Sequence, residues 1–385
     1  MENQAMVESR DKMKKKKLLF ELTKAISKVD ESMVKMTISQ DVDLDATIIY
    51  SKTPLSYSLE MDAENIAILL LEKGANPEKP ATCEKSNHVL CPIHFASKFN
   101  QTKFLSALLK RNVDLDVKTS AELSALHYAA YAGHLSICSD LINHGANVNS
   151  RDSHSRTPLH RAAENGQTAV IDLLVKSGAD VCAEDEMGNT PLIIACYLNQ
   201  TLAAKSLLDM YNNVNFCNKE GNSALHVACS QSIQNSDNFK KTTYGRAIFG
   251  RQMFHHNHVF HFEYKLADIL VSSGANVEAV NTMGLTPFEC ARTFVTPETQ
   301  LALLEKFVNA GLWVSDFSPD TYVPLNPTFQ PDYEEVLSFM RLKQITLKQQ
   351  CKRIIRKSIV MKGGKSMQCY VGCLPLPMQL QNYLL

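Results

Sequence analysis

The sequence lacks an excess of charge of either sign and lacks any apolar run long enough to cross a bilayer. Its 385 residues contain 40 Lys and Arg against 40 Asp and Glu, so the formal net charge is zero. This balance excludes a general electrostatic attraction to nucleic acid or acidic lipid, although it says little about local patches. The longest apolar runs, such as IAILLL at residues 66–71, are far shorter than the roughly 20 residues that span a membrane. We therefore expect neither nucleic acid nor a membrane among the partners.

Signals for secretion and for a disulfide framework are also missing. Residues 1–19 are polar and basic and contain no apolar core of signal-peptide length, so we expect a protein that stays inside the cell. The 11 cysteines are scattered, and none forms a C-x-x-C pair, which favours reduced thiols. The run Lys14–Lys17 fits either a solvated tail, which we prefer, or a nuclear-localisation patch. The expected location is the cytoplasm, with the nucleus as a second compartment.

What the sequence does contain is a repeated unit. The segments CPIHFASKFN, SALHYAAYAGH, TPLHRAAENGQ, TPLIIACYLNQ and SALHVACSQ begin at positions 91, 124, 157, 190 and 223, so successive starts differ by the same step. A second landmark follows at a fixed offset within the unit, as in GANVN at 145 and GADVC at 178. TPLSYSLE at 53 leads to GANPE at 74 with the same offset, and a degenerate unit begins near Phe20. Self-similarity at a constant period predicts a stack of short structural units.

Each unit predicts two short helices. Thr157 or Ser124 stands at an N-cap position, and a proline in the first turn needs no backbone donor. Gly166 lies in the gap before a second helix, TAVIDLLVKSG, whose Ile and Leu residues recur at a spacing of three to four. Gly178 then supplies a left-handed C-terminal cap. Such a helix pair cannot bury its own apolar faces, whereas a stack of pairs does so.

The period and the T-P-L-H-x-A landmark resemble the ankyrin repeat. The resemblance covers residues 20–318 and implies an all-α ankyrin solenoid of about eight helix-turn-helix units of about 33 residues each, degenerate ends included. In such a unit the slot shared by four histidines is a local hydrogen-bonding position beside the turn. Stacked units would hold these histidines on the order of 10 Å apart, too far for one zinc ion with bonds of about 2 Å. We therefore expect structural roles for His94, His127, His160 and His226.

An insertion interrupts the unit that begins at Ser223. The next start, Thr286, comes almost twice as far along the chain as the period predicts, which places the additional residues around 233–262. This insertion is rich in aromatic residues, histidine and positive charge. A variable loop and a projecting loop that contacts a partner both remain open. A metal site at its histidines is a third, less favoured interpretation: His255, His256, His258 and His261.

The chain after the repeats divides into a linker and a short terminal module. Residues 319–340 contain prolines and show no helical period, as expected of a linker. Residues 341–385 begin with a basic amphipathic helix whose apolar face carries Leu347 and Cys351 and whose other faces carry Lys348 and Lys352. A module of about 45 residues is near the lower limit for a core of its own. Its apolar stripe must therefore be covered, either by the array or by another protein.

Two short motifs in this module carry a second resemblance. TLKQQCKRII resembles the elongin-binding box, and LPLP at 374–377 resembles the cullin-5 box. At the end of an ankyrin array, the two together resemble the ankyrin-repeat and SOCS-box family. The resemblance implies elongin-binding residues at Thr346, Leu347, Cys351, Ile354 and Ile355. It implies cullin-binding residues at Leu374, Pro375, Leu376 and Pro377.

By this resemblance the protein is the substrate-recognition subunit of an elongin B/C–cullin-5–RING ubiquitin ligase. The array would bind a target, with no catalysis, metal or cofactor of its own. The alternative is a non-catalytic ankyrin scaffold whose C-terminal helices only cap the solenoid. An enzymatic role for Cys351 is disfavoured because no paired base is evident, and MKGGKS lacks the first glycine of a phosphate loop. Candidate target-binding residues are Tyr128, Tyr131, His154, Arg156, Arg161, Glu164 and Tyr197.

Overall fold

The computed structural model describes residues 2–47, 52–83, 89–210, 213–230, 265–292 and 307. The chain divides into two units, residues 1–210 and residues 211–385, and each is described by itself. Within the described ranges, no helix is both long and apolar enough to cross a membrane. The predicted insertion around 233–262, the linker at 319–340 and the module at 341–385 lie outside the described residues.

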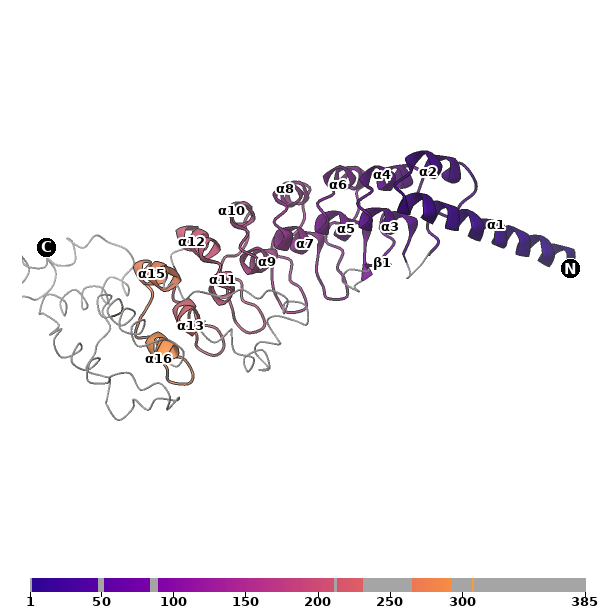
Figure 1. Ribbon diagram of the computed structural model, residues 1–385. Helices are drawn as coiled ribbons and strands as arrows, with labels where there is room; N and C mark the ends of the chain where they lie inside the picture. Colours follow the sequence, from indigo (N-terminus) through magenta and orange to yellow (C-terminus); the bar gives the residue numbers. More distant parts are fainter. Residues whose placement is uncertain are drawn as a thin grey trace, which may run out of the picture. The chain divides into compact units, whose positions relative to one another are not determined.

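The first unit is built from helices in two adjacent rows (Figure 1). Neighbouring first-row helices pack on one another, and each packs on the second-row helix that follows it in the chain. The first row contains α3 (Pro54–Glu60), α5 (Pro92–Lys98), α7 (Ala125–Ala132), α9 (Pro158–Glu164) and α11 (Pro191–Tyr197). The second row contains α4 (Glu64–Glu72), α6 (Thr102–Leu109), α8 (Leu135–Asn143), α10 (Thr168–Lys176) and α12 (Thr201–Met210). The predicted helix pairs are confirmed.

The helices begin where the repeat period places them. Thr53, Cys91, Ser124, Thr157 and Thr190 are the N-cap residues of the first-row helices, all with extended backbones. Proline follows the cap in α3, α5, α9 and α11, where its missing N–H removes no helical bond. Gly166 and Gly178 adopt φ values of 70° and 88°, so the predicted turn and left-handed cap are also confirmed.

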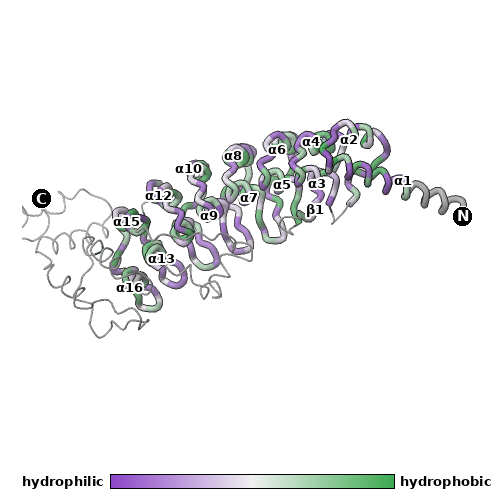
Figure 2. The backbone as a smooth tube through the Cα atoms, in the orientation of Figure 1, coloured by the Kyte–Doolittle hydropathy of each residue, from purple (hydrophilic) through white to green (hydrophobic). Residues whose placement is uncertain are grey.

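The array starts with α1 (Glu2–Ser27), which packs on α2 (Glu31–Ile38) and on α3. Leu22 and Ile26 of α1 are fully buried, as are Phe95 and Phe104 further along the unit. Hydrophobic residues concentrate in the helices, while the connecting loops are largely hydrophilic (Figure 2). A short antiparallel pair, β1 (Ala81–Thr82) and β2 (Val89–Leu90), aligns Ala81 with Leu90 and Thr82 with Val89.

The second unit contains α13 (Ala224–Ser230), α15 (Lys265–Ser272) and α16 (Pro287–Arg292). Helix α13 packs on both of the others. The turns before α13 and α16 are bonded to each other, since the Thr282 N–H donates to the Glu220 carbonyl at 2.9 Å. Phe288 meets Phe307 edge to face, with ring centroids 6.2 Å apart. Two parts of the chain on either side of the insertion therefore form one ankyrin-like unit.

We expect Gly221→Ala to destabilise the second unit more than Gly284→Ala does. Gly221 has φ +73°, and a Cβ there would lie 3.0 Å from both Asn281 Cα and Thr282 N, which are backbone atoms. Gly284 has φ +76°, but its Cβ would meet nothing within 4 Å. The expected losses in unfolding free energy are about 2–3 kcal/mol and about 1 kcal/mol, measured by hydrogen exchange of the α13–α16 amides. Equal losses would mean that the close approach of the two turns contributes nothing to the cost of the Gly221→Ala substitution.

Candidate functional site

Four buried histidines connect successive repeats. In each case Nδ1 accepts a hydrogen bond from the backbone N–H of the N-cap residue three positions earlier, at 3.1 or 3.2 Å. Because Nδ1 accepts, Nε2 carries the proton and donates to a carbonyl in the next hairpin, at 3.0 to 3.2 Å. The recipient carbonyls of His94, His127, His160 and His226 belong to Val117, Arg156, Asn189 and Leu285. The predicted local hydrogen-bonding role is confirmed.

These bonds require neutral imidazoles. Burial lowers the pKa of His94, His127 and His160 to about 4, although their backbone acceptors favour the charged form. Burial lowers the pKa of His226 as well. We call this series of histidine hydrogen bonds the histidine ladder. It is interrupted in α11, where Ile193 occupies the position of the histidine. The histidines therefore hold first-row helices in register with the hairpins that follow them.

Acidic and amide side chains stabilise the hairpin turns, and they recur once per repeat as the histidines do. Asp152 Oδ1 accepts hydrogen bonds from the N–H groups of His154 and Arg156, at 2.8 and 2.9 Å. Asp185 Oδ1 does the same for Met187 and Asn189. Asn218, one repeat after Asp185, shows the same pattern in the second unit. Adjacent turns of the first unit are joined through the Glu186 N–H and the His154 carbonyl, 3.0 Å apart.

Three of the predicted target-binding residues meet in a buried ion cluster. Arg161 on α9 pairs with Asp152 and, at 2.9 Å, with Glu164 on the same helix. Arg156 lies 3.6 Å from Glu164 Oε2 and 3.6 Å from Asp185 Oδ2. Arg156, Glu164, Asp152 and Asp185 are buried, and Arg161 is mostly so. Two guanidinium groups and three carboxylates are thus enclosed between α9 and the two hairpins that flank it.

Pairing within the cluster favours the ionised forms of Asp152 and Arg161. Burial would raise the pKa of Asp152, but Arg161 and two backbone N–H donors lower it overall. Burial would lower the pKa of Arg161, whereas Glu164 and Asp152 raise it overall. Sequence reasoning missed Asp152 and Asp185 as partners of the two arginines. The signal that identifies them is the spacing of one repeat that separates Asp152, Asp185 and Asn218 at successive turns.

The remaining target-binding candidates differ in exposure. Tyr131 on α7 is 36% exposed, and its pKa is raised by burial and then by nearby Glu164. Tyr128 is half-buried, and burial raises its pKa. Tyr197 is buried at 7% exposure, so it has little surface to offer a partner in this conformation. His154 is exposed at a hairpin turn, with Nδ1 3.2 Å from Glu186 Oε2. Binding by these residues stays a prediction.

The predicted elongin- and cullin-binding residues lie outside the described residues, as do the four histidines of the insertion. Their roles stay predictions from the sequence. In the part of the chain that the structure describes, no group of three or more His, Cys, Asp and Glu side chains is arranged to hold a metal ion. The candidates that the structure describes therefore comprise the exposed side chains of Tyr131 and His154 and a buried ion cluster, all on a hydrogen-bonded frame.

Comparisons with protein families match both parts of the chain. A family model for ankyrin repeats, in three copies, matches residues 93–185 and 181–241. A family model for the SOCS box matches residues 345–385. A search among curated proteins gave no match. The ankyrin match covers the helices from α5 to α13, and the SOCS-box match covers the terminal module with its two short motifs.

Proposed function

The chain belongs to the ankyrin-repeat and SOCS-box family, and from this premise we propose that it is the substrate-recognition subunit of an elongin B/C–cullin-5–RING ubiquitin ligase. The observation that carries the proposal is the order of the two modules. A SOCS box, which is a module that binds elongin B/C and a cullin, follows ankyrin repeats, which present a surface for another protein. One chain therefore contains both halves of an adaptor.

Ankyrin repeats and SOCS boxes are non-catalytic adaptor modules, so the contribution of this chain is proximity. The array binds a target protein while the SOCS box binds the ligase core. Target lysines are then held at a high local concentration near a charged ubiquitin-conjugating enzyme, and this converts an encounter between separate molecules into a step within one complex. This role requires no cofactor.

We assign the elongin contact to one face of the helix that the sequence predicts at the start of the SOCS box. Leu347 enters an apolar pocket of elongin C, and Cys351 packs beside it, where a larger side chain does not fit. Ile354 and Ile355 extend the same contact, with Thr346 at the start of the helix. This is a helix-in-groove interaction, in which apolar side chains at a spacing of three to four carry the binding.

The cullin contact is assigned to the LPLP segment, residues 374–377. Two prolines restrict its backbone, so little conformational entropy is lost when it binds. We propose cullin-5 as the partner because this segment resembles the cullin-5 box. We propose the cytoplasm as the location. The nucleus is a second proposed compartment, with the Lys14–Lys17 run as the nuclear-localisation signal.

The proposed target surface is the first-row side of the array around α7 and α9. Tyr131 is the most exposed aromatic residue among the candidates, and His154 and Glu186 are exposed at the adjacent turns. Aromatic side chains contribute large contact areas with few rotatable bonds, which favours them at protein interfaces. The buried cluster of Arg156, Arg161 and Glu164 supports this surface from beneath.

The elongin assignment predicts a large loss of binding for Leu347→Ala. Burying one leucine side chain stabilises a complex by about 1.5–3 kcal/mol, so we expect elongin B/C to bind roughly 10- to 100-fold more weakly. Cys351→Phe should have a similar effect, because a larger side chain has no space in the groove. The measurement is titration of purified elongin B/C against the full chain, followed by co-purification of cullin-5.

Lys348→Ala is the matched control, because it changes the neighbouring residue on another face of the same helix and should leave elongin binding unchanged. Replacing Leu374 and Leu376 with alanine should remove cullin-5 and retain elongin B/C. If the wild-type chain bound no elongin B/C, the ligase proposal would be wrong. The chain would then be a plain ankyrin scaffold with a terminal helical cap.

A further inference from the structure

One face of α1 is exposed, basic and partly apolar. Met13 and Phe20 are 71% and 67% exposed, although both are large hydrophobic residues. At 100° per residue, the residues within about 60° of Met13 form a single stripe about 22 Å long, and all of them are exposed. We call this stripe the α1 outer face; it consists of Met13, Lys16, Lys17, Phe20, Lys24 and Ser27, together with Lys28 directly after the end of the helix.

The opposite face of α1 holds the helix in the array. Leu18, Leu22, Ala25 and Ile26 lie within about 60° of the opposite direction, and all four are buried. The helix packs through them on α2 and α3. The orientation of the outer face is therefore fixed by the fold, and Met13 and Phe20 cannot turn inward without unpacking the helix.

Positive charge is concentrated on the α1 outer face. Between residues 13 and 28, this face carries four lysines and no acidic residue. Lys14 is exposed beside it, while Lys15 is engaged by Asp41 at 3.1 Å, and the one acidic residue of this stretch, Glu21, lies outside the face. The net charge of the whole chain is zero, so this patch is a local departure from the average.

The charge excludes several occupants that belong to this chain. A second copy joined by a two-fold axis would bring lysines against lysines. The basic stretches at residues 240–265 and 348–357 carry the same sign of charge and do not complement the face. In a repeat array the outermost face is normally polar, which keeps the end of the stack soluble. Exposed Met13 and Phe20 depart from that rule and indicate an acidic or anionic partner with an apolar part.

We propose that the α1 outer face binds an anionic lipid surface. A partner helix would need apolar anchors at spacings of three, four and seven residues, whereas among the side chains of this face that the structure describes only Met13 and Phe20 are large and apolar, seven residues apart. A bilayer needs no such match. Its surface potential acts on every lysine within a screening length of about 8–10 Å, and Phe20 and Met13 enter the interfacial region between the headgroups.

This inference replaces the expectation of no membrane partner, which rested on the charge of the chain as a whole. It is independent of the proposed ligase function, because elongin and cullin binding use the other end of the sequence. A ligase subunit held at an anionic membrane would select targets that are also at that membrane. The lipid contact and the elongin contact are therefore measured separately on the same purified chain.

The test is flotation of the full-length chain with vesicles of phosphatidylcholine containing about one third phosphatidylserine. We expect binding to these vesicles and not to phosphatidylcholine alone. Raising the salt from about 0.1 M to about 1 M should abolish it, because the screening length falls from about 10 Å to about 3 Å. Changing Lys16, Lys17 and Lys24 to glutamine should weaken binding about 100-fold, at roughly fivefold per lysine.

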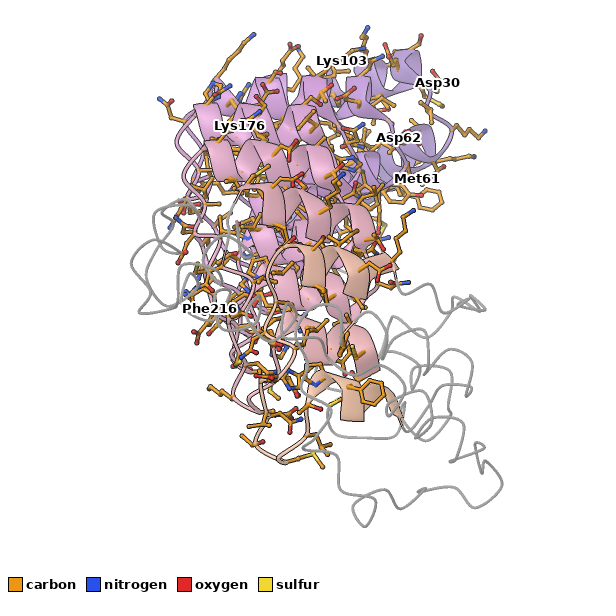
Figure 3. The ribbon with its side chains drawn as sticks, turned by 90° about the vertical axis from the view of Figure 1, so that its left-hand side faces the viewer. Asp30, Met61, Asp62, Lys103, Lys176 and Phe216 are labelled. Carbon is orange, nitrogen blue, oxygen red and sulfur yellow. The ribbon has the colours of Figure 1, made fainter. Side chains whose placement is uncertain are left out.

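Matched controls come from the second-row helices. Lys103, Lys176 and Lys205 are exposed on α6, α10 and α12, and the first two are labelled in Figure 3. Changing these three lysines to glutamine removes the same charge and should alter binding less than twofold. Phe20→Ser should weaken binding roughly fivefold, whereas Leu202→Ser, at a residue 73% exposed on α12, should not. All the substituted side chains are exposed, and thermal unfolding checks that each variant stays folded.

Three results would overturn the proposal. The first is no binding of the wild-type chain to the anionic vesicles. The second is an equal loss for the α1 variant and the control variant, which would indicate a general charge effect. The third is tighter binding to a DNA duplex with no effect of Phe20→Ser on the vesicles, which would make the lysines a nucleic-acid site.

Discussion

Replacing Glu164 with alanine is expected to lower the free energy of unfolding by about 3–5 kcal/mol. The carboxylate of Glu164 is 2.9 Å from Arg161 and 3.6 Å from Arg156, and its side chain is only 5% exposed. Its removal leaves two enclosed guanidinium groups with one carboxylate fewer between them. The two arginines then lose part of the negative charge that compensates for their burial.

Thermal and urea unfolding of the full chain measure this loss, with hydrogen exchange of the α9 amides to locate it. Glu186→Ala is the control, because Glu186 forms a solvent-exposed pair with His154 and should cost less than about 1 kcal/mol. A loss from Glu164→Ala as small as that of the control would show that water reaches the cluster. Arg161 would then be available to a target.

The repeat frame was predictable because its determinants are local. Caps, first-turn prolines and left-handed glycines each act within a single helical turn, as does the Nδ1 bond of the histidine slot, so they can be read from any one unit. Their recurrence once per repeat then fixes the stack. The short β1–β2 pair was not predicted, because Ala81–Thr82 and Val89–Leu90 show no extended period and pair only after the flanking helices are placed.

The candidate target surface was predictable only in part. The positions of Arg156, Arg161 and Glu164 follow from the repeat, but their mutual pairing depends on how two hairpins fold against α9. Tyr197 illustrates the limit, because the same slot is exposed at Tyr131 and buried at Tyr197. Helical phase alone cannot distinguish these two cases, since the neighbouring repeat decides how much of each ring is covered.

The beginning of the chain shows a similar limit. A run of lysines indicates a solvated tail, and these lysines are indeed exposed. However, Leu18, Leu22 and Ile26 follow at helical spacing, and their burial extends α1 through the basic run. The lysines correctly indicated that this segment is exposed to solvent. The helical spacing of the apolar residues determined that the segment is a helix. The exposed side of that helix is where the α1 outer face arises.

Acidification from pH 7 to pH 5 is expected to destabilise the array well before its carboxylates are protonated. His94, His127 and His160 have folded pKa values of about 4, below the ordinary value of 6.5. Between these values the unfolded chain binds more protons than the folded chain, so stability falls as the pH falls. Each histidine contributes up to about 1.4 kcal/mol per pH unit in this window.

The physical reason is the burial of the rings, which penalises the charged form, and the hydrogen bond at Nδ1 adds to it. Protonated Nδ1 of His127 would face the Ser124 N–H that now donates to it, 3.1 Å away, so the charged ring breaks the cap. Hydrogen exchange of the α7 and α9 amides at several pH values measures the local opening.

His127→Gln should be less stable than the wild-type chain at pH 7. Its stability should depend less on pH, because one titrating group has been removed. His144→Gln, at the exposed C-cap residue of α8, is the matched control for the substitution itself. If His127→Gln kept the full dependence on pH, the histidine ladder would not be the acid-sensitive element of the array.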